Sequence, residues 1–246
     1  MTTDAITAQS NRQARPGWGG LRAALVAVLV LGLLAVGFML ARPVKVLPRL
    51  GAAPSYTLTD PQGRPLGSDD LRGKVVLYDF VYTSCETVCP AMTAQMMQVQ
   101  QRLEDERWLG EDVVLVTITF DPERDTPERL LAESRKFGAV EGGWHWLTGE
   151  LIAIKQLVGG EFGVYFEKVE AENAPHDADH AHEGYDFVHA TVFVLVDADG
   201  QIRSEYHQML NLDEVMRDIE LVVREKNAPP LAQPVWQAAH AIRAYP

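Results

Sequence analysis

Two cysteines, Cys85 and Cys89, lie in the segment Tyr82-Thr-Ser-Cys-Glu-Thr-Val-Cys-Pro90, and the chain has no others. An apolar run over residues 74–81 leads into this segment, and a helix-like run begins at Pro90. The thiols therefore stand at a predicted strand-to-helix junction. Placed four positions apart at a helix entrance, they have Cα atoms about 6 Å apart, within reach of a disulfide. Two such thiols can form a disulfide, exchange one or hold a soft metal.

The spacing of the two cysteines and their position at the start of a helix help to choose among these three roles. Cys89 directly precedes Pro90, so we expect it at the helix N-terminus, where unpaired N–H groups and the helix dipole favour a thiolate. The plain alternative is a structural disulfide or a pair of inert thiols, but closing so short a loop removes little chain entropy. Thiol oxidoreductases favour Cys-x-x-Cys, whereas three residues intervene here. Two sulfurs suit linear Cu(I), and a nearby imidazole makes a three-coordinate site for either copper oxidation state.

The best candidate for that imidazole is His189, in the segment Asp186-Phe-Val-His-Ala-Thr191. It precedes an apolar strand that we predict to begin at Thr191, where a loop can approach the cysteine loop. A lone histidine before a strand is more often a structural hydrogen-bonding group than a ligand. The residues alone leave both roles open.

Strand-like and helix-like segments alternate along the chain. The predicted strands are 75–81, 113–120 and 191–197, with 202–206 paired to the last of these through the turn 198–200. The predicted helices are 90–107, 127–137, 150–162 and 212–226. The second follows Asp125-Thr126, an N-cap pair, and has Pro127 at its first position. Alternating elements closed by a hairpin predict an α/β fold with a mixed sheet flanked by helices.

A membrane anchor is predicted near the N-terminus. Residues 23–41 contain no charge, and as a helix they would be about 28 Å long, close to the thickness of a bilayer core. A cleaved signal peptide, with Ala35-Val-Gly37 as the cleavage site, is the alternative. Three basic residues precede the run and three follow it, so charge does not fix the orientation. Because a large domain follows a short early span, we expect a single-pass protein of the bacterial inner membrane with its domain facing the periplasm.

The predicted domain organisation follows from these segments. It comprises a disordered cytoplasmic N-terminus (1–20), the transmembrane anchor (21–41), a linker (42–54), a globular domain (55–226) and a loosely held, proline-containing tail (227–246). The formal net charge of −12 makes nucleic acid an unsuitable partner. Cationic surfaces and metal ions are electrostatically easier partners.

An acidic segment, residues 161–186, holds eight carboxylates and one lysine. Such a composition cannot easily bury a core, so we expect a mobile loop. Within it, His176, His180 and His182 offer imidazoles that bind Zn²⁺ or Cu²⁺. The segment is either a solvated polar loop or an auxiliary site that captures metal weakly near His189.

The chain resembles the SCO/SenC family of copper chaperones. The resemblance rests on the cysteine segment 82–90, on Asp121-Pro-Glu-Arg-Asp-Thr-Pro-Glu128, and on the segment from His189 through Phe193-Val-Leu-Val-Asp197 to Gly200. It covers about residues 56–223, and the combination of motifs is highly specific.

The resemblance implies a thioredoxin-like fold and copper, as Cu(I) or Cu(II), held by Cys85, Cys89 and His189. It also implies delivery to the binuclear copper centre of cytochrome c oxidase, with the copper-bearing subunit and other copper chaperones as partners. Such a protein is a chaperone rather than an enzyme. Thiol–disulfide chemistry on the oxidase or on partner chaperones is also described for the family.

The cysteine loop departs from the family pattern at one place, and two other activities are close alternatives. The family usually has Pro-Asp where this chain has Glu86-Thr87, which changes local charge and loop shape but keeps the ligand types. A thiol–disulfide reductase would need Cys85 and Cys89 but not His189. A peroxiredoxin-like peroxidase would need an activating arginine near its cysteine, and the sequence does not place one.

Several other residues carry weaker expectations. Met96 lies on the apolar face of the helix that follows the cysteines and is predicted to pack in the core. Asp79 stands within an apolar strand, where a buried carboxylate needs a partner that the sequence does not name. His145, His207 and His240 carry no spacing signal.

Overall fold

The computed structural model describes residues 18–41, 46–170 and 185–243. These residues belong to two compact units, divided between Lys45 and Val46. The first unit contributes one helix, and the second holds the cysteines and the predicted core.

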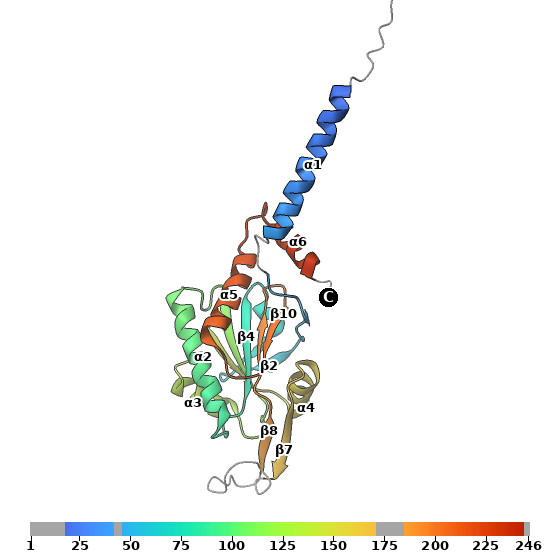
Figure 1. The fold of residues 1–246 in the computed structure, drawn as a ribbon. Helices are drawn as coiled ribbons and strands as arrows, with labels where there is room; N and C mark the ends of the chain where they lie inside the picture. The colour runs from blue at the N-terminus through green and yellow to red at the C-terminus, as the bar shows by residue number, and fades with distance from the viewer. Residues whose placement is uncertain (1–17, 42–45, 171–184, 244–246) are drawn as a thin grey trace, which may run out of the picture. The chain divides into compact units, whose positions relative to one another are not determined.

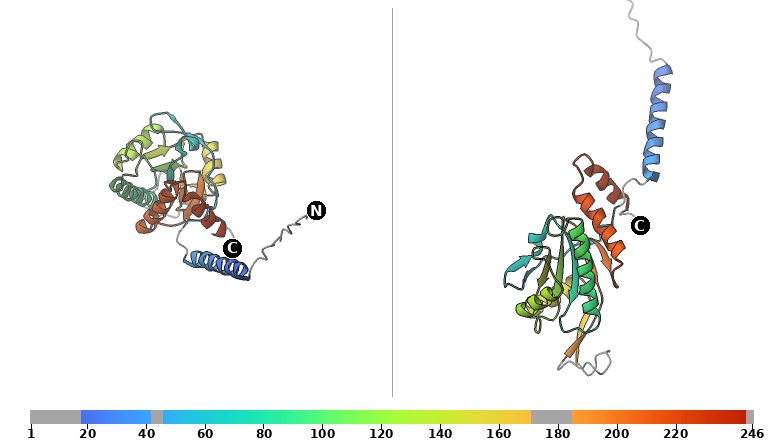
Figure 2. Two further views of the ribbon diagram at one scale, coloured as in Figure 1. Left: turned by 90° about the horizontal axis from the view of Figure 1, so that it is seen from above. Right: turned by 90° about the vertical axis from the view of Figure 1, so that its left-hand side faces the viewer.

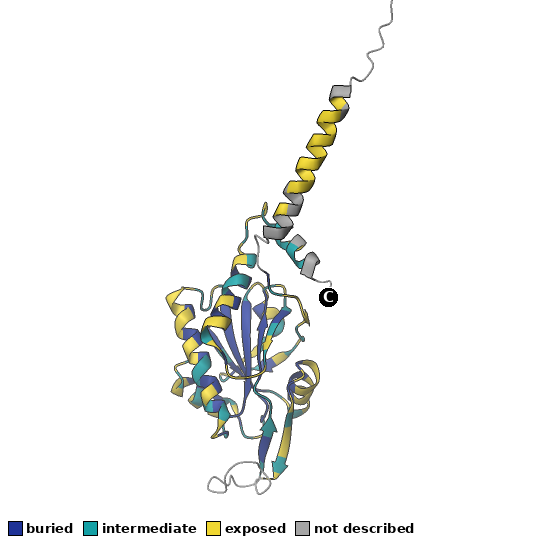
Figure 3. Ribbon diagram, viewed as in Figure 1, coloured by how far each residue is buried: buried dark blue, intermediate teal, exposed yellow. Residues whose placement is uncertain are grey.

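Helix α1, Trp18–Ala41, is the described part of the first unit. Its described side chains are exposed, including large apolar ones such as Leu25, Val28 and Leu33, as Figure 3 shows. A search of the described residues finds no helix with the length and apolar character that crossing a bilayer requires. The anchor over residues 21–41 therefore stays a prediction.

A six-stranded mixed sheet forms the centre of the second unit, in the strand order β1-β10-β9-β4-β5-β6. Strands β4, β5 and β6 are parallel to one another, while β9, β10 and β1 add antiparallel partners on the other side of β4. The strands are β1 (Gly51–Ala52), β4 (Val75–Val81), β5 (Val113–Thr119), β6 (Trp144–Leu147), β9 (Phe193–Val196) and β10 (Gln201–Tyr206). The predicted mixed sheet is confirmed, with the two apolar runs as its buried parallel strands.

Helices cover this sheet, as Figure 1 shows. They are α2 (Val88–Asp105), α3 (Pro127–Lys136), the short α4 (Leu151–Ile154) continued by a π-helix (Lys155–Glu161), and α5 (Leu212–Lys226). A further helix, α6 (Gln233–Arg243), follows α5 in the chain. A 3-10 turn (Ser68–Leu71) follows a small hairpin of β2 (Thr57–Thr59) and β3 (Pro65–Gly67). As the sequence predicts, Thr126 caps α3, because its side chain accepts the Arg129 N–H at 3.4 Å.

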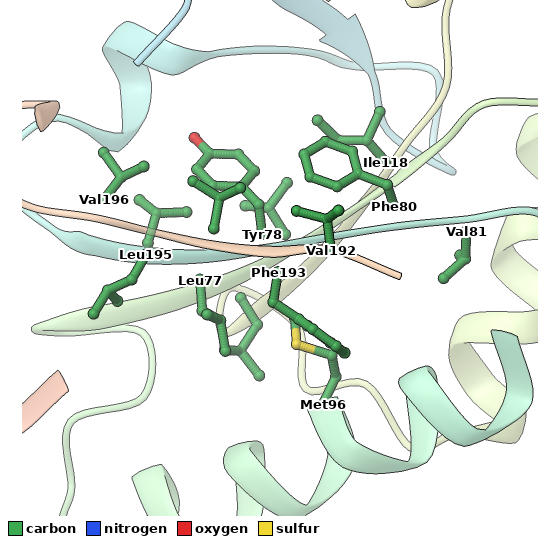
Figure 4. Packing of buried hydrophobic residues seen from close by; sticks show 14 of the residues in the cluster. Leu77, Tyr78, Phe80, Val81, Met96, Ile118, Val192, Phe193, Leu195 and Val196 are labelled. Carbon is green, nitrogen blue, oxygen red and sulfur yellow. The ribbon is translucent and has the colours of Figure 1, made fainter. Parts of the chain in front are cut away.

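The two faces of the sheet are filled by alternate residues of β4. Leu77 points toward α2, where Met96 lies against Phe193, and Tyr78 and Phe80 point to the opposite face, as Figure 4 shows. On that second face both aromatic rings contact Phe162, with centroid distances of 5.3 and 5.0 Å. The whole of β4 is buried, which makes it the axis of the core.

A second hairpin, β7 (Phe166–Glu170) with β8 (Tyr185–His189), is separate from the central sheet. It projects from one end of the domain in both side views (Figures 1 and 2). Part of the acidic segment was expected to be a mobile loop, and for residues 166–170 that expectation is wrong. Five residue pairs in antiparallel register, from Phe166↔His189 to Glu170↔Tyr185, pair the backbone N–H and C=O groups of this segment despite its acidic side chains.

Arg203 on β10 holds together two segments that the sequence suggested were loose. Its guanidinium is almost completely buried and donates to Asp197, Glu225 and the carbonyl oxygens of Leu47 and Pro48. The predicted linker is therefore docked on the domain from residue 46 onward, where Val46 is buried.

The predicted loose tail also differs from the structure. Residues 233–243 form α6, and His240 on this helix lies 2.6 Å from Glu225, the same carboxylate that binds Arg203. Local composition rich in proline did not reveal this, because the partner of the tail lies in another part of the chain.

Replacing Arg203 with Met should lower the free energy of unfolding by about 3–5 kcal/mol, because it leaves the buried carboxylate of Asp197 without its cation and removes the buried cation that Glu225 shares with it. Urea unfolding followed by tryptophan fluorescence measures this. Arg224→Met is the matched control, since its pair with Glu220 is exposed and should change stability by less than about 0.5 kcal/mol. Equal effects of the two substitutions would contradict a structural role for the Arg203 network.

Candidate metal centre

The cysteine loop lies between the end of β4 and the start of α2. Cys85 lies in the loop, and Cys89 is the second residue of the helix. Both side chains are buried, and both thiols are free. The loop residues between them, Glu86 and Thr87, are exposed and form the outer rim of the site.

His189 faces the two sulfurs. It is the last residue of β8 and not, as the sequence suggested, a residue at the entrance of the next sheet strand. Its Nε2 lies 3.7 Å from Cys89 Sγ, and the ligand atoms of Cys85, Cys89 and His189 all lie within 4.8 Å of one another. The structure therefore brings the three predicted ligands together.

The tautomer of His189 follows from its second ring nitrogen. Nδ1 lies 3.2 Å from the carbonyl oxygen of Ala190, which can only accept, so Nδ1 carries the proton and donates. Nε2 is then left with its lone pair toward the sulfurs, as a metal ligand requires.

Charge is divided unequally between the two thiols. The Cys89 thiol donates to Cys85 Sγ, and this hydrogen bond, helped by the Cys89 N–H at 3.4 Å, holds the pKa of Cys85 far below its usual range despite burial. Burial, followed by the hydrogen bond to Cys85, raises the pKa of Cys89 well above its usual value. The expectation of a Cys89 thiolate is therefore wrong. The backbone N–H at the helix entrance points at Cys85 Sγ instead.

Aromatic rings surround the imidazole. The His189 ring lies 5.1 Å from that of Phe120 and 5.7 Å from that of Tyr82, the latter edge-on at 89°. Phe187, two residues before His189, packs against the same two rings. This apolar surrounding excludes water from one side of the site and strengthens interactions between the charges within it.

A buried carboxylate ties the cysteine loop to the loop after β5. Asp125 accepts hydrogen bonds from the backbone N–H of Thr83 at 3.0 Å, from the Thr83 hydroxyl and from the Thr119 hydroxyl. In the same region Arg129 donates to Ser84 at 3.0 Å. This arginine is thus bonded to the residue next to Cys85, and the Cys85 thiolate is stabilised by the thiol and the backbone N–H of Cys89 rather than by a guanidinium.

Asp79, the odd carboxylate of β4, is completely buried. The hydroxyl of Thr117 on β5 donates to its Oδ1 at 2.6 Å, which supplies the partner that the sequence did not name. Among the described groups its Oδ2 has no hydrogen-bond partner. Burial raises the pKa of Asp79 to about 7, and its charge in turn helps to raise the pKa of Cys89.

The three donor atoms fit a copper ion. Thiolate and imidazole bonds of about 2.0–2.3 Å, as in zinc sites, place the donors of a three-coordinate ion roughly 3.5–4 Å apart. The observed separations, 3.7 Å for one pair and at most 4.8 Å for all, need only a small contraction. Two soft sulfurs and one imidazole are also the donor types that copper prefers over Mg²⁺ or Ca²⁺.

The other sequence candidates are a methionine on the cysteine helix and three histidines of the acidic segment. Met96 is fully buried in the core as predicted, whereas its neighbour Met97 is partly exposed. His176, His180 and His182, the predicted capture histidines, lie outside the described residues.

Sequence reasoning overlooked two residues beside the site, Tyr82 and Asp186. Each precedes a predicted ligand by three positions, Tyr82 before Cys85 and Asp186 before His189. The Tyr82 hydroxyl donates to Asp186 Oδ1 across 104 residues of chain. No local pattern reveals such a pair, although a tyrosine among apolar strand residues signals a hydroxyl in need of a partner.

Comparisons with known proteins agree with this site. A family model described as SCO1/SenC matches residues 48–224. The SCO1 protein homolog of Bacillus subtilis (strain 168) is 29% identical over 168 residues, which are 67% of this chain and 79% of that protein.

Two solved structures extend the comparison. ScoI of Bradyrhizobium japonicum with copper bound has a TM-score of 0.56 and 26% identity, covering 70% of this chain and 99% of that one. BsSco, described as a member of the Sco family of cytochrome c oxidase assembly proteins with a disulfide switch, has a TM-score of 0.57 and 25% identity, covering 73% of this chain and 97% of that one.

Replacing Asp79 with Asn should flatten the dependence of stability on pH. The folded state holds the Asp79 proton more tightly than the unfolded chain, so the stability it contributes is greatest at acid pH and is lost as pH rises through about 7. Between about pH 5 and about pH 8 the variant should lose roughly 2–3 kcal/mol of pH dependence. Urea unfolding at about pH 5 and about pH 8, with thiols reduced, tests this. Asp199→Asn, at an exposed carboxylate, is the control, and equal slopes in the two variants would refute the prediction.

Proposed function

Because the chain belongs to the SCO1/SenC family, we propose that it is a copper chaperone that holds one copper ion through Cys85, Cys89 and His189. One observation carries the proposal, namely that two sulfurs and the unprotonated Nε2 of a histidine face one another within 4.8 Å. The soft donors select copper, and the copper-bound relative from Bradyrhizobium japonicum supports the choice of metal.

Metal uptake is coupled to protons in this site. Cys85 is already poised as a thiolate, whereas Cys89 must lose its proton before its sulfur binds a metal. The ion then replaces that proton between the two sulfurs. Copper leaves by ligand exchange when a partner offers thiolates or imidazoles of its own, and the exposed rim at Glu86 and Thr87 is where such a partner can approach.

We further propose that the recipient is the binuclear copper centre of cytochrome c oxidase, in the copper-bearing subunit, reached directly or through other copper chaperones. The description of BsSco as a member of a family of oxidase assembly proteins supports this assignment. The proposal includes an N-terminal membrane anchor, on the strength of the uncharged run over residues 23–41, with the copper domain in the periplasm. His176, His180 and His182 would capture copper weakly near His189.

A second candidate function is thiol–disulfide reduction of oxidase or chaperone cysteines. It is favoured by the uneven charge of the pair, since a buried thiolate with a neighbouring thiol has the form of an attacking and a resolving cysteine. The disulfide switch of BsSco points the same way. This chemistry needs both cysteines and does not need His189.

Single alanine substitutions at Cys85, Cys89 and His189 should each abolish stoichiometric copper binding, because each removes one of three donors. Anaerobic metal analysis of the reduced protein, after removal of loosely bound ions, gives the copper content directly. His207→Ala is the matched control, since this histidine is exposed and paired with Glu205, and it should leave one copper per chain. Full copper content in any of the three site variants would remove that residue from the centre.

The same variants separate the two functions. A chaperone with His189→Ala should lose copper binding and oxidase assembly together. A reductase with the same substitution should keep the rate at which it reduces a disulfide substrate and should still support assembly. Loss of assembly with full reductase activity therefore supports the chaperone, and retained assembly without copper supports the reductase.

A further inference from the structure

The strand that carries His189 is not part of the sheet that carries the cysteines. Strand β8 pairs with β7 alone in a two-stranded sheet, whereas the cysteine loop follows β4 in the central sheet. No ladder of backbone hydrogen bonds therefore fixes the distance between the imidazole and the sulfurs. Side-chain contacts must fix it, because isolated two-stranded hairpins are marginally stable by themselves.

One hydrogen bond joins the two parts next to the ligands. Tyr82 follows β4 directly, and its hydroxyl donates to Asp186 Oδ1 on β8. Both side chains are buried, with 1% and 5% of their surface exposed, so water cannot replace either partner. Burial and the bond to Asp186 raise the pKa of Tyr82, which keeps its hydroxyl protonated as a donor.

Each end of this bond is coupled to a ligand. The carbonyl oxygen of Tyr82 accepts the Cys85 N–H at 3.3 Å, which places Tyr82 at the base of the cysteine loop. The Tyr82 ring meets the His189 ring edge-on, and Asp186 Oδ1 also accepts the N–H of Phe187 at 2.8 Å within β8. The carboxylate is thus oriented by its own strand while it receives the phenol.

Further polar contacts join the hairpin to the loop after β5, not to the cysteine segment. Arg124 donates to the carbonyl oxygen of Tyr185 at 2.8 Å, the Tyr185 hydroxyl donates to Asp121 at 2.8 Å, and Lys168 pairs with Glu123. These contacts gather at the Tyr185 end of β8, four residues from His189. They hold the hairpin to the domain without setting the position of its other end over the sulfurs.

We propose that Tyr82 is a positioning residue for copper, whose hydrogen bond to Asp186 holds β8 against the end of β4 and keeps His189 Nε2 at ligand distance before the ion arrives. The inference rests on the proposed copper function. Without the bond, the hairpin spends part of its time with the imidazole withdrawn, and the apparent affinity for copper falls by the fraction of molecules that remain competent.

Tyr82→Phe tests this with the least disturbance, since the ring and its contacts with Phe120, Phe187 and His189 are retained. Tyr78→Phe is the matched control, because Tyr78 is buried on β4, the strand that Tyr82 follows, and loses only its contact with the Tyr56 hydroxyl. In the copper-free, reduced protein, amide hydrogen exchange across Tyr185–His189 should become about tenfold faster in Tyr82→Phe and stay unchanged in Tyr78→Phe. Unchanged exchange in Tyr82→Phe would overturn the proposal.

Copper affinity, measured by competition with a Cu(I) chelator, gives the second readout. Tyr82→Phe should weaken binding about tenfold when His189 is present. In a His189→Ala background it should have no effect on the weak residual binding of Cu(I) by the two sulfurs, because the tyrosine acts through the histidine. The same weakening in both backgrounds would show a merely structural role and overturn the proposal. A wild-type protein that takes up no copper would refute the proposed function instead, and the exchange experiment would still decide whether the bond holds the hairpin.

Discussion

The 3.7 Å approach of His189 Nε2 to Cys89 Sγ, across 100 residues of chain, is the contact on which this site depends. Two sulfurs alone suit only linear Cu(I), and the imidazole adds the third donor that suits either oxidation state of copper. The sulfurs lie after the end of β4 in the central sheet, and the imidazole lies on a separate hairpin. The contacts between these two parts of the domain hold the imidazole close to the sulfurs.

Burial of the two sulfurs determines how many of the two thiols are charged. Both sulfurs are enclosed, rings of Phe120 and Phe187 close one side, and few solvent dipoles remain to stabilise charge. Under these conditions one thiol keeps its proton and donates it to the other, so the pair carries a single negative charge. A copper ion bound there replaces the shared proton, so that Cu(I) leaves the charge of the pair unchanged and Cu(II) neutralises it. Metal occupancy, protonation and redox state are therefore linked in one site.

Two polar groups near the site, Asp125 and Tyr82, are buried with defined partners, and each links two elements. Asp125 joins the cysteine loop to the loop after β5, and Tyr82 joins β4 to β8. Such bonds are costly to leave unmade in an apolar interior, so they specify one arrangement more sharply than packing alone. At the far end of the sheet Arg203 does the same for the segment after residue 46 and for the C-terminal helix.

The sequence alone determined the elements and the donor types. The apolar runs at 75–81 and 113–119 predicted β4 and β5, and Thr126 with Pro127 predicted the start of α3, because periodicity and capping are properties of adjacent residues. The tertiary structure decided what depends on residues far apart in the chain. It placed the imidazole at the end of an unexpected hairpin, made Cys85 rather than Cys89 the thiolate, and paired Tyr82 with Asp186. The physical reason is that burial and hydrogen-bond partners arise only when distant segments pack together, and no local pattern contains them.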